Sequence, residues 1–395
     1  MEDGGGKRVS WVELYLDLIF VLAVGQLSHL IVAEPEMRSV WIALGLFFTL
    51  WWTWIGFSVL YNRFGVDAAP QRLLFLAGSV PTGVAAVAIE PASTGDVGVF
   101  AVSLAITRLI LAGANGMDGG WHELLRGRIA VSYGISALLF VVSIWVPEPF
   151  RYVLWAAAIA LESGALLHED KRAARRARRE HDLKAFAPEN PEEALDAHHF
   201  AERFGLFLII LLGEVVVEAG QASVDGHVAT FGGWAALVAA MILAAALWWL
   251  YFDSAADLNL RVLELSGGSP TMARAIFAVG HMLPCFALLL IAAGVGLLIE
   301  EDPPRIAFSL TCVGLGIYLL GTRVFMTAKT HLARAARLVL LIAIFSLARL
   351  HETVSPHAYL WLLTVIAVVC AALAMRRTAS DADLQRYISR REGDR

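Results

Sequence analysis

The chain has 395 residues, 58% of them hydrophobic, with a formal net charge of -5 and a mean hydropathy of +0.65. A soluble protein of this length rarely reaches such an apolar fraction. The composition therefore excludes an ordinary soluble protein and predicts an all-α, polytopic integral membrane protein, with the lipid bilayer as its surroundings. The slightly acidic net charge gives no reason to expect a nucleic-acid partner.

The first apolar stretch, residues 11–33, is about as long as one membrane-spanning helix. It contains Glu13 and Asp17, which are four residues apart and therefore share one face of a helix. Acidic groups inside an apolar span are costly when they face lipid. We expect this face to point into the protein, toward a cation, a proton or water.

Eleven more apolar runs follow, and together with the first they predict about twelve transmembrane helices. They occupy residues 40–60, 72–90, 97–112, 129–146, 150–168, 200–220, 230–252, 273–299, 305–326, 335–350 and 357–375. The expected domains are a six-helix half at 1–168, a charged linker at 169–199, a second six-helix half at 200–376 and a tail at 377–395.

Lysine and arginine are unevenly distributed over the loops between these runs. If the N-terminus is cytoplasmic, most of the 31 Lys and Arg fall on the cytoplasmic side, and the opposite loops carry acids such as Glu34 and Glu300. This positive-inside pattern predicts a protein of the cytoplasmic (inner) membrane with both termini in the cytoplasm. The basic stretch at 171–184 is either a solvated linker or a segment that contacts anionic lipid head groups.

The second half of the chain repeats features of the first, which predicts two parallel six-helix repeats related by an axis along the membrane normal. Matched positions are Glu13 with Glu202, Arg72 with Arg274, Gly78 with Gly280, and Pro81 with Pro284, the last pair one residue out of register. Proline frees a carbonyl and kinks a helix. Interrupted helices in corresponding positions of two halves indicate a transport site.

Three groups of ionisable residues are candidates for a substrate or ion pathway. The first combines the acids Glu13, Asp17 and Glu202 with the arginines Arg72 and Arg274, which open their spans from the same side. Pairing between these acids and arginines would satisfy both partners. The cluster is either an ion-pair latch between the first and third helices or a gate or coupling site.

The second group is the pair Glu214 and Glu218, one turn apart in the seventh run, with His29 at the position that aligns with Glu218. Two carboxylates in a medium of low dielectric repel, so we expect at least one of them to hold a proton near neutral pH. The pair is either a proton or cation site, or it makes hydrogen bonds to neighbouring helices. The third group is His281 beside Pro284, which is either a packing histidine or part of a site at a broken helix.

The opening VSWVELYLDLIFVLAVGQLSHLI and the segment ERFGLFLIILLGE at 202–214 resemble the bacterial low temperature requirement protein A (LtrA) family. The resemblance covers essentially the whole chain and implies a polytopic membrane protein. The family label refers to growth in the cold, and it supplies no catalytic residues. A weaker resemblance is to six-plus-six-helix lysosomal-type potassium channels, but Tyr15-Leu16-Asp17 lacks the serine of their aromatic–Ser–Asp motif.

The residues favour a transporter of a small solute or ion, and coupling of that transport to protons is one version of this hypothesis. A cation channel, a membrane enzyme acting on lipid and a non-transporting stress protein remain alternatives. The sequence contains no Walker loop, no Gly-x-Ser-x-Gly and no His-Glu-x-x-His, so no catalytic residues, cofactor or metal are predicted. The transported species and the oligomeric state are left open.

Overall fold

The protein is all-helical in the part of the chain that its structure, a computed structural model, describes: residues 9–64, 68–117, 124–167, 183–188, 194–225, 231–322 and 340–375. Within these residues six helical stretches are long and apolar enough to cross a membrane. They are Trp11–Ala33, Met37–Asn62, Gly98–Gly116, Phe231–Leu265, Pro270–Ile299 and Pro356–Ala374. The count of twelve spans stays a prediction.

The helices fall into two groups in chain order. The first group is α1 (Trp11–Ala33), α2 (Met37–Phe64), α3 (Ala69–Val87), the short α4 (Ile89–Ser93), α5 (Gly98–Met117), α6 (Leu124–Ser143) and α7 (Phe150–Leu167). A 3-10 turn η1 (Leu183–Phe186) precedes the second group. That group is α9 (Ala197–Asp225), α10 (Phe231–Leu250), the π-helical turn η3 (Tyr251–Ala255), α11 (Ala256–Leu265), α12 (Pro270–Ala273), a second π-helical turn η4 (Arg274–Val279), α13 (Met282–Ile299), α14 (Arg305–Gly321), the 3-10 turn η5 (Leu347–Glu352) and α16 (Pro356–Met375).

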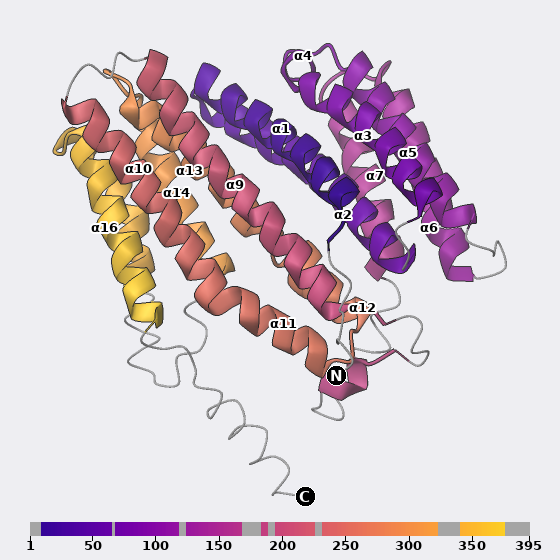
Figure 1. The fold of residues 1–395 in the computed structure, drawn as a ribbon. Helices are drawn as coiled ribbons and strands as arrows, with labels where there is room; N and C mark the ends of the chain where they lie inside the picture. Colours follow the sequence, from indigo (N-terminus) through magenta and orange to yellow (C-terminus); the bar gives the residue numbers. More distant parts are fainter. Residues whose placement is uncertain are drawn as a thin grey trace, which may run out of the picture.

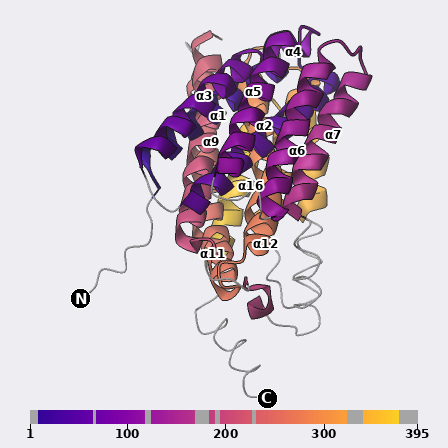
Figure 2. The same ribbon diagram turned by 90° about the vertical axis from the view of Figure 1, so that its right-hand side faces the viewer.

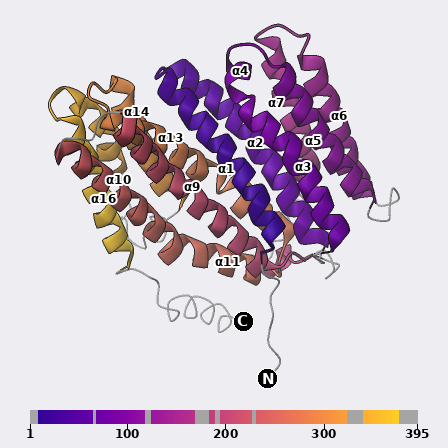
Figure 3. The ribbon, with the colours of Figure 1, turned by 45° about the horizontal axis from the view of Figure 1, so that its top comes forward.

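Helices α1 and α9 lie beside each other at the centre of the molecule (Figures 1 and 3). Helices α2, α3, α5, α6 and α7 extend to one side of them, and α10, α13, α14 and α16 extend to the other. Viewed after a rotation of 90° about the vertical axis, the long helices form one bundle (Figure 2). Helix α13 packs against α9, α14 and α1, and every residue from Pro284 to Ile299 is buried. The two groups therefore meet along α1, α9 and α13.

Helix α1 begins with a capping interaction that already uses one of its acids. The Ser10 backbone N–H and hydroxyl both donate to Glu13 Oε2, at 3.0 and 3.1 Å. An acidic side chain three residues into a helix commonly satisfies a free backbone donor in this way. The cap fixes Glu13 at the first turn of α1.

The two expected helix breaks differ from each other. Helix α3 continues from Ala69 to Val87 through Pro81, so the break expected at Gly78 and Pro81 is wrong. The Thr82 hydroxyl donates to the Gly78 carbonyl at 2.8 Å, within the turn that contains Pro81.

The corresponding segment of the second group is interrupted, as expected. The π-helical turn η4 ends at Val279, and α13 begins only at Met282, two residues before Pro284. A Cβ at Gly280 would lie 2.2 Å from the Ile276 carbonyl oxygen, so only glycine fits where the π-helical turn tightens. The interruption exists in one half of the chain, and the two segments are not equivalent.

Several expectations fall on residues outside the described ranges. The basic stretch at 171–184 lies outside them except for its last two residues, and the tail from 377 lies wholly outside. The run expected at 335–350 is described only from residue 340, where it is helical to 346 and then continues as η5.

Candidate functional site

Two carboxylates of α1 and one guanidinium of α9 meet in a buried cluster at the centre of the molecule. Arg203 Nη1 donates to Glu13 Oε1 at 2.6 Å, and Arg203 Nη2 donates to Asp17 Oδ1 at 3.2 Å. The exposed fraction of each of the three side chains is 1% or less. The expectation that the acidic face of the first helix points into the protein is confirmed.

His199, one turn before Arg203 on α9, is the second partner of Glu13. Its Nε2 lies 3.1 Å from Glu13 Oε2, and its Nδ1 lies 3.1 Å from the Asn62 side-chain nitrogen. The imidazole therefore bridges Glu13 of α1 and Asn62 of α2.

An aromatic shell encloses the same cluster. Trp54 Nε1 donates to Asp17 Oδ1 at 2.6 Å, and the Arg203 guanidinium lies 5.5 Å above the Trp54 ring. The rings of Phe204 and Phe207 pack on Trp54 at centroid distances of 4.7 and 4.3 Å. This packing keeps the ion pairs in a medium of low dielectric, which strengthens them. We call Glu13, Asp17, Trp54, His199 and Arg203 the α1–α9 cluster.

The α1–α9 cluster has an uneven charge balance. Two carboxylates face one guanidinium and one imidazole, so the guanidinium alone does not balance both acids when they are ionised. Within the described residues, Asp17 Oδ2 and Arg203 Nε are buried without a hydrogen-bond partner. Buried polar atoms of this kind are uncommon and call for a water, an ion or a proton. A proton on the imidazole or on one acid, or a bound monovalent cation, would balance the second carboxylate.

Arg72 was expected to pair with Glu13 and Asp17, but the arginine that does so is Arg203. Arg72, at the start of α3, is exposed, whereas Arg203 holds both Glu13 and Asp17. Among the other members of that expected cluster, Glu202 is exposed and Arg274 is buried. The missed signal was the spacing, because His199 and Arg203 repeat on α9 the four-residue separation of the two acids on α1.

The acidic pair of α9 lies at the same junction, about three turns further along the helix. Glu214 is partly buried against α1, with its Oε1 3.1 Å from where a Cβ would stand on Gly25. Glu218 is partly buried against α13, with its Oε2 3.3 Å from the corresponding point on Gly296. No ion pair to either carboxylate occurs within the described ranges. His29, their expected neighbour, is exposed and lies close enough to interact electrostatically with Glu218.

His281 has partners for both ring nitrogens. Its Nδ1 donates to the Ile276 carbonyl at 2.9 Å, and its Nε2 accepts from the Tyr251 hydroxyl at 2.7 Å. The carbonyl belongs to the π-helical turn η4, so the imidazole satisfies a backbone group that the interruption leaves available. Of the two interpretations of His281, the contacts favour the packing histidine.

A second buried ion pair, which the sequence did not predict, lies within the first helix group. Arg108 of α5 donates through Nε to Glu162 Oε1 of α7 at 3.1 Å, and through Nη1 to the Thr53 hydroxyl of α2 at 2.7 Å. The Ser136 hydroxyl of α6 donates to the same carboxylate oxygen. The pair therefore joins four helices of the first group, and it lies away from α9.

The comparisons with known proteins agree with the helical architecture. The family model described as "Bacterial low temperature requirement A protein (LtrA)" matches residues 8–374. The chain belongs to the LtrA family. This LtrA chain is also 26% identical over 310 residues to an uncharacterized protein of Rhizobium meliloti (strain 1021), a match that covers 74% of the chain and 70% of that relative. No solved structure matches the present chain.

Membership of the LtrA family together with the long apolar helices makes the chain a membrane protein. The LtrA match spans both helix groups and the α1–α9 cluster between them. The description of the family names no reaction.

Proposed function

We propose that the protein transports a small cation, or a solute coupled to one, along the junction of α1 and α9. The proposal includes the expected topology: two parallel six-helix halves, an inner-membrane location and cytoplasmic termini. The central position of α1 and α9, with one helix group on each side, supports this topology (Figure 1). The first helix of each half would then line the pathway.

The observation that carries the proposal is the pair Glu214 and Glu218. Both carboxylates belong to an apolar helix, and each lies against a glycine of a neighbouring helix, Gly25 or Gly296. Each carboxylate packs closely on the backbone of the neighbouring helix, and neither makes an ion pair within the described residues. A carboxylate in such a place needs a proton or a bound cation, and residues of this type mark ion pathways in membrane proteins.

The α1–α9 cluster supplies a second titratable position on the same two helices. Eleven residues separate Arg203 from Glu214, which corresponds to about 16 Å along a helix. The cluster holds two acids and one guanidinium, so it can respond to a proton or cation that reaches it. The two positions would then act as the ends of one pathway.

Buried apolar side chains between these two positions favour a carrier over an open channel. Phe20 and Val24 of α1, and Phe207 and Leu211 of α9, are exposed by 5% or less. A stretch lined by such residues excludes hydrated ions in this conformation. Passage would require α1 and α9 to move relative to each other, as in alternating access.

Flux measurements in liposomes test the proposal. The purified full chain is reconstituted, proton and potassium gradients are applied in turn, and a pH dye and a potassium-sensitive dye report movement. We expect Glu214→Gln and Glu218→Gln each to lower flux by at least about tenfold, because an amide keeps the size of the acid and loses its charge. Glu202→Gln, an exposed glutamate on the same helix, is the matched control and should keep flux.

Wild-type protein without flux under either gradient overturns the proposal. Equal flux in Glu214→Gln and wild type would remove the carboxylate from the pathway. A steady current without a counter-gradient, at rates beyond those of a carrier, would assign the protein to the cation channels instead.

A further inference from the structure

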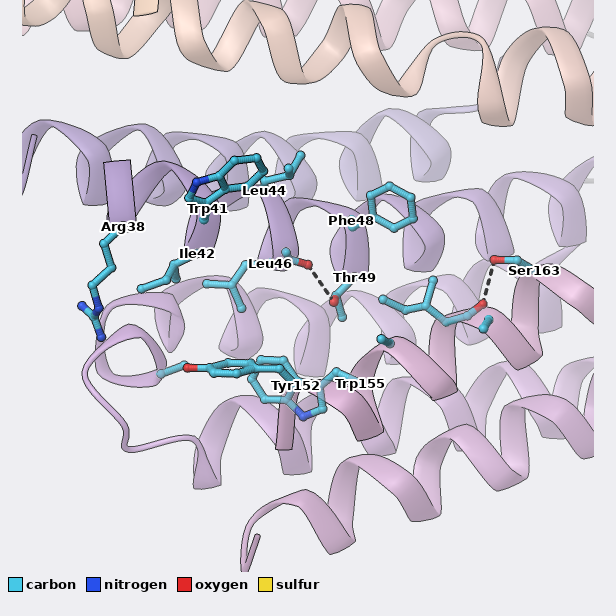
Figure 4. Close-up of a pocket in the computed structure, with 15 residues that line it drawn as sticks. Arg38, Trp41, Ile42, Leu44, Leu46, Phe48, Thr49, Tyr152, Trp155 and Ser163 are labelled. Atoms are coloured by element: carbon cyan, nitrogen blue, oxygen red, sulfur yellow. Dashed lines mark hydrogen bonds between the residues drawn. The ribbon is translucent and has the colours of Figure 1, made fainter. Parts of the chain in front are cut away.

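A long groove separates α2 from α7 on the first helix group, away from the α1–α9 cluster (Figure 4). Its volume is about 710 Å³, within the range of roughly 300–1,000 Å³ found for ligand sites. Arg38, Trp41 and Thr49 line it from α2, and Tyr152 and Trp155 line it from α7 (Figure 4).

The two ends of the groove differ in chemistry. At one end Arg38 is exposed and Trp41 has 65% of its surface exposed. At the other end the hydroxyl groups of Thr49 and Ser163 donate to carbonyls of their own helices, at 3.0 and 2.7 Å. The hydroxyl hydrogens at the deep end are therefore already used, while the guanidinium of Arg38 makes no hydrogen bond within the described part of the chain.

The length of the groove matches one leaflet of a bilayer. Eleven residues of α2 separate Arg38 from Thr49, a rise of about 16 Å, and half of a bilayer's hydrocarbon core is about 15 Å. Arginine, tryptophan and tyrosine are the residues expected where hydrocarbon meets head groups. The mouth of the groove thus belongs at the interface, and its floor belongs at the middle of the membrane.

We propose that a glycerophospholipid occupies this groove, with one acyl chain between α2 and α7 and its phosphate at Arg38. Guanidinium groups bind phosphate oxygens through paired hydrogen bonds. At the same mouth Glu148 accepts a hydrogen bond from the Tyr152 hydroxyl at 2.8 Å and pairs with Arg151 at 4.0 Å, so its charge already has a partner. The Arg38 guanidinium is therefore the charge that selects a phosphate head group, such as that of phosphatidylethanolamine.

The bound lipid would also act on the interior of the first helix group. The carbonyl of Thr49, on the floor of the groove, accepts a hydrogen bond from Arg108 Nη2 at 3.4 Å. A chain packed against the floor covers the helix segment that holds this buried arginine, so the lipid would be a structural part of the protein.

Gly45 allows the groove to be filled without disturbing the helices. It lies on the groove wall, and a Cβ built there meets nothing within 4 Å. Gly45→Leu therefore places a side chain where the acyl chain would lie. Ala160→Leu does the same from α7, because Ala160 is an exposed residue of the opposite wall.

Native mass spectrometry of the purified full chain tests the proposal. The protein is stripped of lipid in detergent, phosphatidylethanolamine is added, and the fraction carrying one lipid is measured. We expect Arg38→Gln to reduce retention about fivefold, the effect of one basic residue near a lipid head group, and Gly45→Leu to reduce it at least as much. Gly113→Leu, another glycine with open space, and Arg305→Gln, another exposed arginine, are matched controls that should retain the lipid.

Each other outcome overturns the assignment. Equal retention in all variants places the lipid elsewhere. Loss in Gly45→Leu but not in Arg38→Gln, or equal retention of diacylglycerol with the same chains, excludes recognition of the phosphate. A fall in oligomer mass in Gly45→Leu assigns the groove to a second copy of the chain. Melting temperatures are measured in parallel, and Ala160→Leu replaces Gly45→Leu if that variant does not fold.

Discussion

Replacing Arg203 with methionine should strongly destabilise the protein. The substitution keeps an unbranched side chain of similar length but leaves Glu13 and Asp17 buried without their cation. Removing one member of a buried ion pair costs about 3–5 kcal/mol, because the remaining charge has no compensation. Arg203 also touches two acids and lies over Trp54, which places the expected loss at the upper end of that range.

The comparison that isolates this effect is Arg72→Met. Arg72 is exposed, and exposed ion pairs contribute about 0–1 kcal/mol. Free energies of unfolding are measured by denaturant titration in mixed micelles for both variants and for Arg203→Met combined with Asp17→Asn. The double variant removes one of the stranded charges, so it should be more stable than Arg203→Met alone. Equal stability of Arg203→Met and wild type, or equal losses at the two arginines, would refute the described ion pairing.

Three further predictions concern other parts of the molecule. Arg108→Met should cost about 3–5 kcal/mol, and adding Glu162→Met should recover part of it, since an apolar pair can replace a buried ion pair; unfolding titrations measure both. Gly314→Ala should cost about 1–3 kcal/mol because its Cβ would lie 2.9 Å from a backbone oxygen of α13, whereas Gly113→Ala, with open space, should not; melting temperatures compare them. Arg175→Cys should react with an impermeant maleimide only after cells are opened, which checks the predicted orientation; the three native cysteines are buried.

The sequence predicted the helical class and the burial of the α1 acids for a physical reason. Two charges one turn apart in an apolar helix have few stable environments other than the protein interior, and Glu13 and Asp17 are fully buried. The same cost argument applies to any long apolar run, which is why the predicted boundaries of α1 agree with the structure. The polarity pattern of one helix was therefore predictable, whereas the break expected at Pro81 was not, because α3 continues through that proline.

The sequence did not predict which side chains of different helices pair with each other. Arg72 was chosen because it opens a neighbouring helix from the same side, and α3 does pack against α1. The guanidinium that reaches the acids comes from α9, because the rotation of that helix turns Arg203 and not Glu202 toward α1. The pairing of Arg108 with Glu162 likewise depends on how α5 and α7 face each other. A single sequence does not contain these rotations.

The separation of the α1–α9 cluster in the chain has a consequence for biosynthesis. Arg203 is translated 186 residues after Asp17, which at roughly 5–20 residues per second is a delay of about 10–40 s. During that time α1 has left the ribosome while its two acids lack their basic partner. A nascent chain that stops before α9 presents a helix with uncompensated acids, a form that membrane quality-control proteases can recognise.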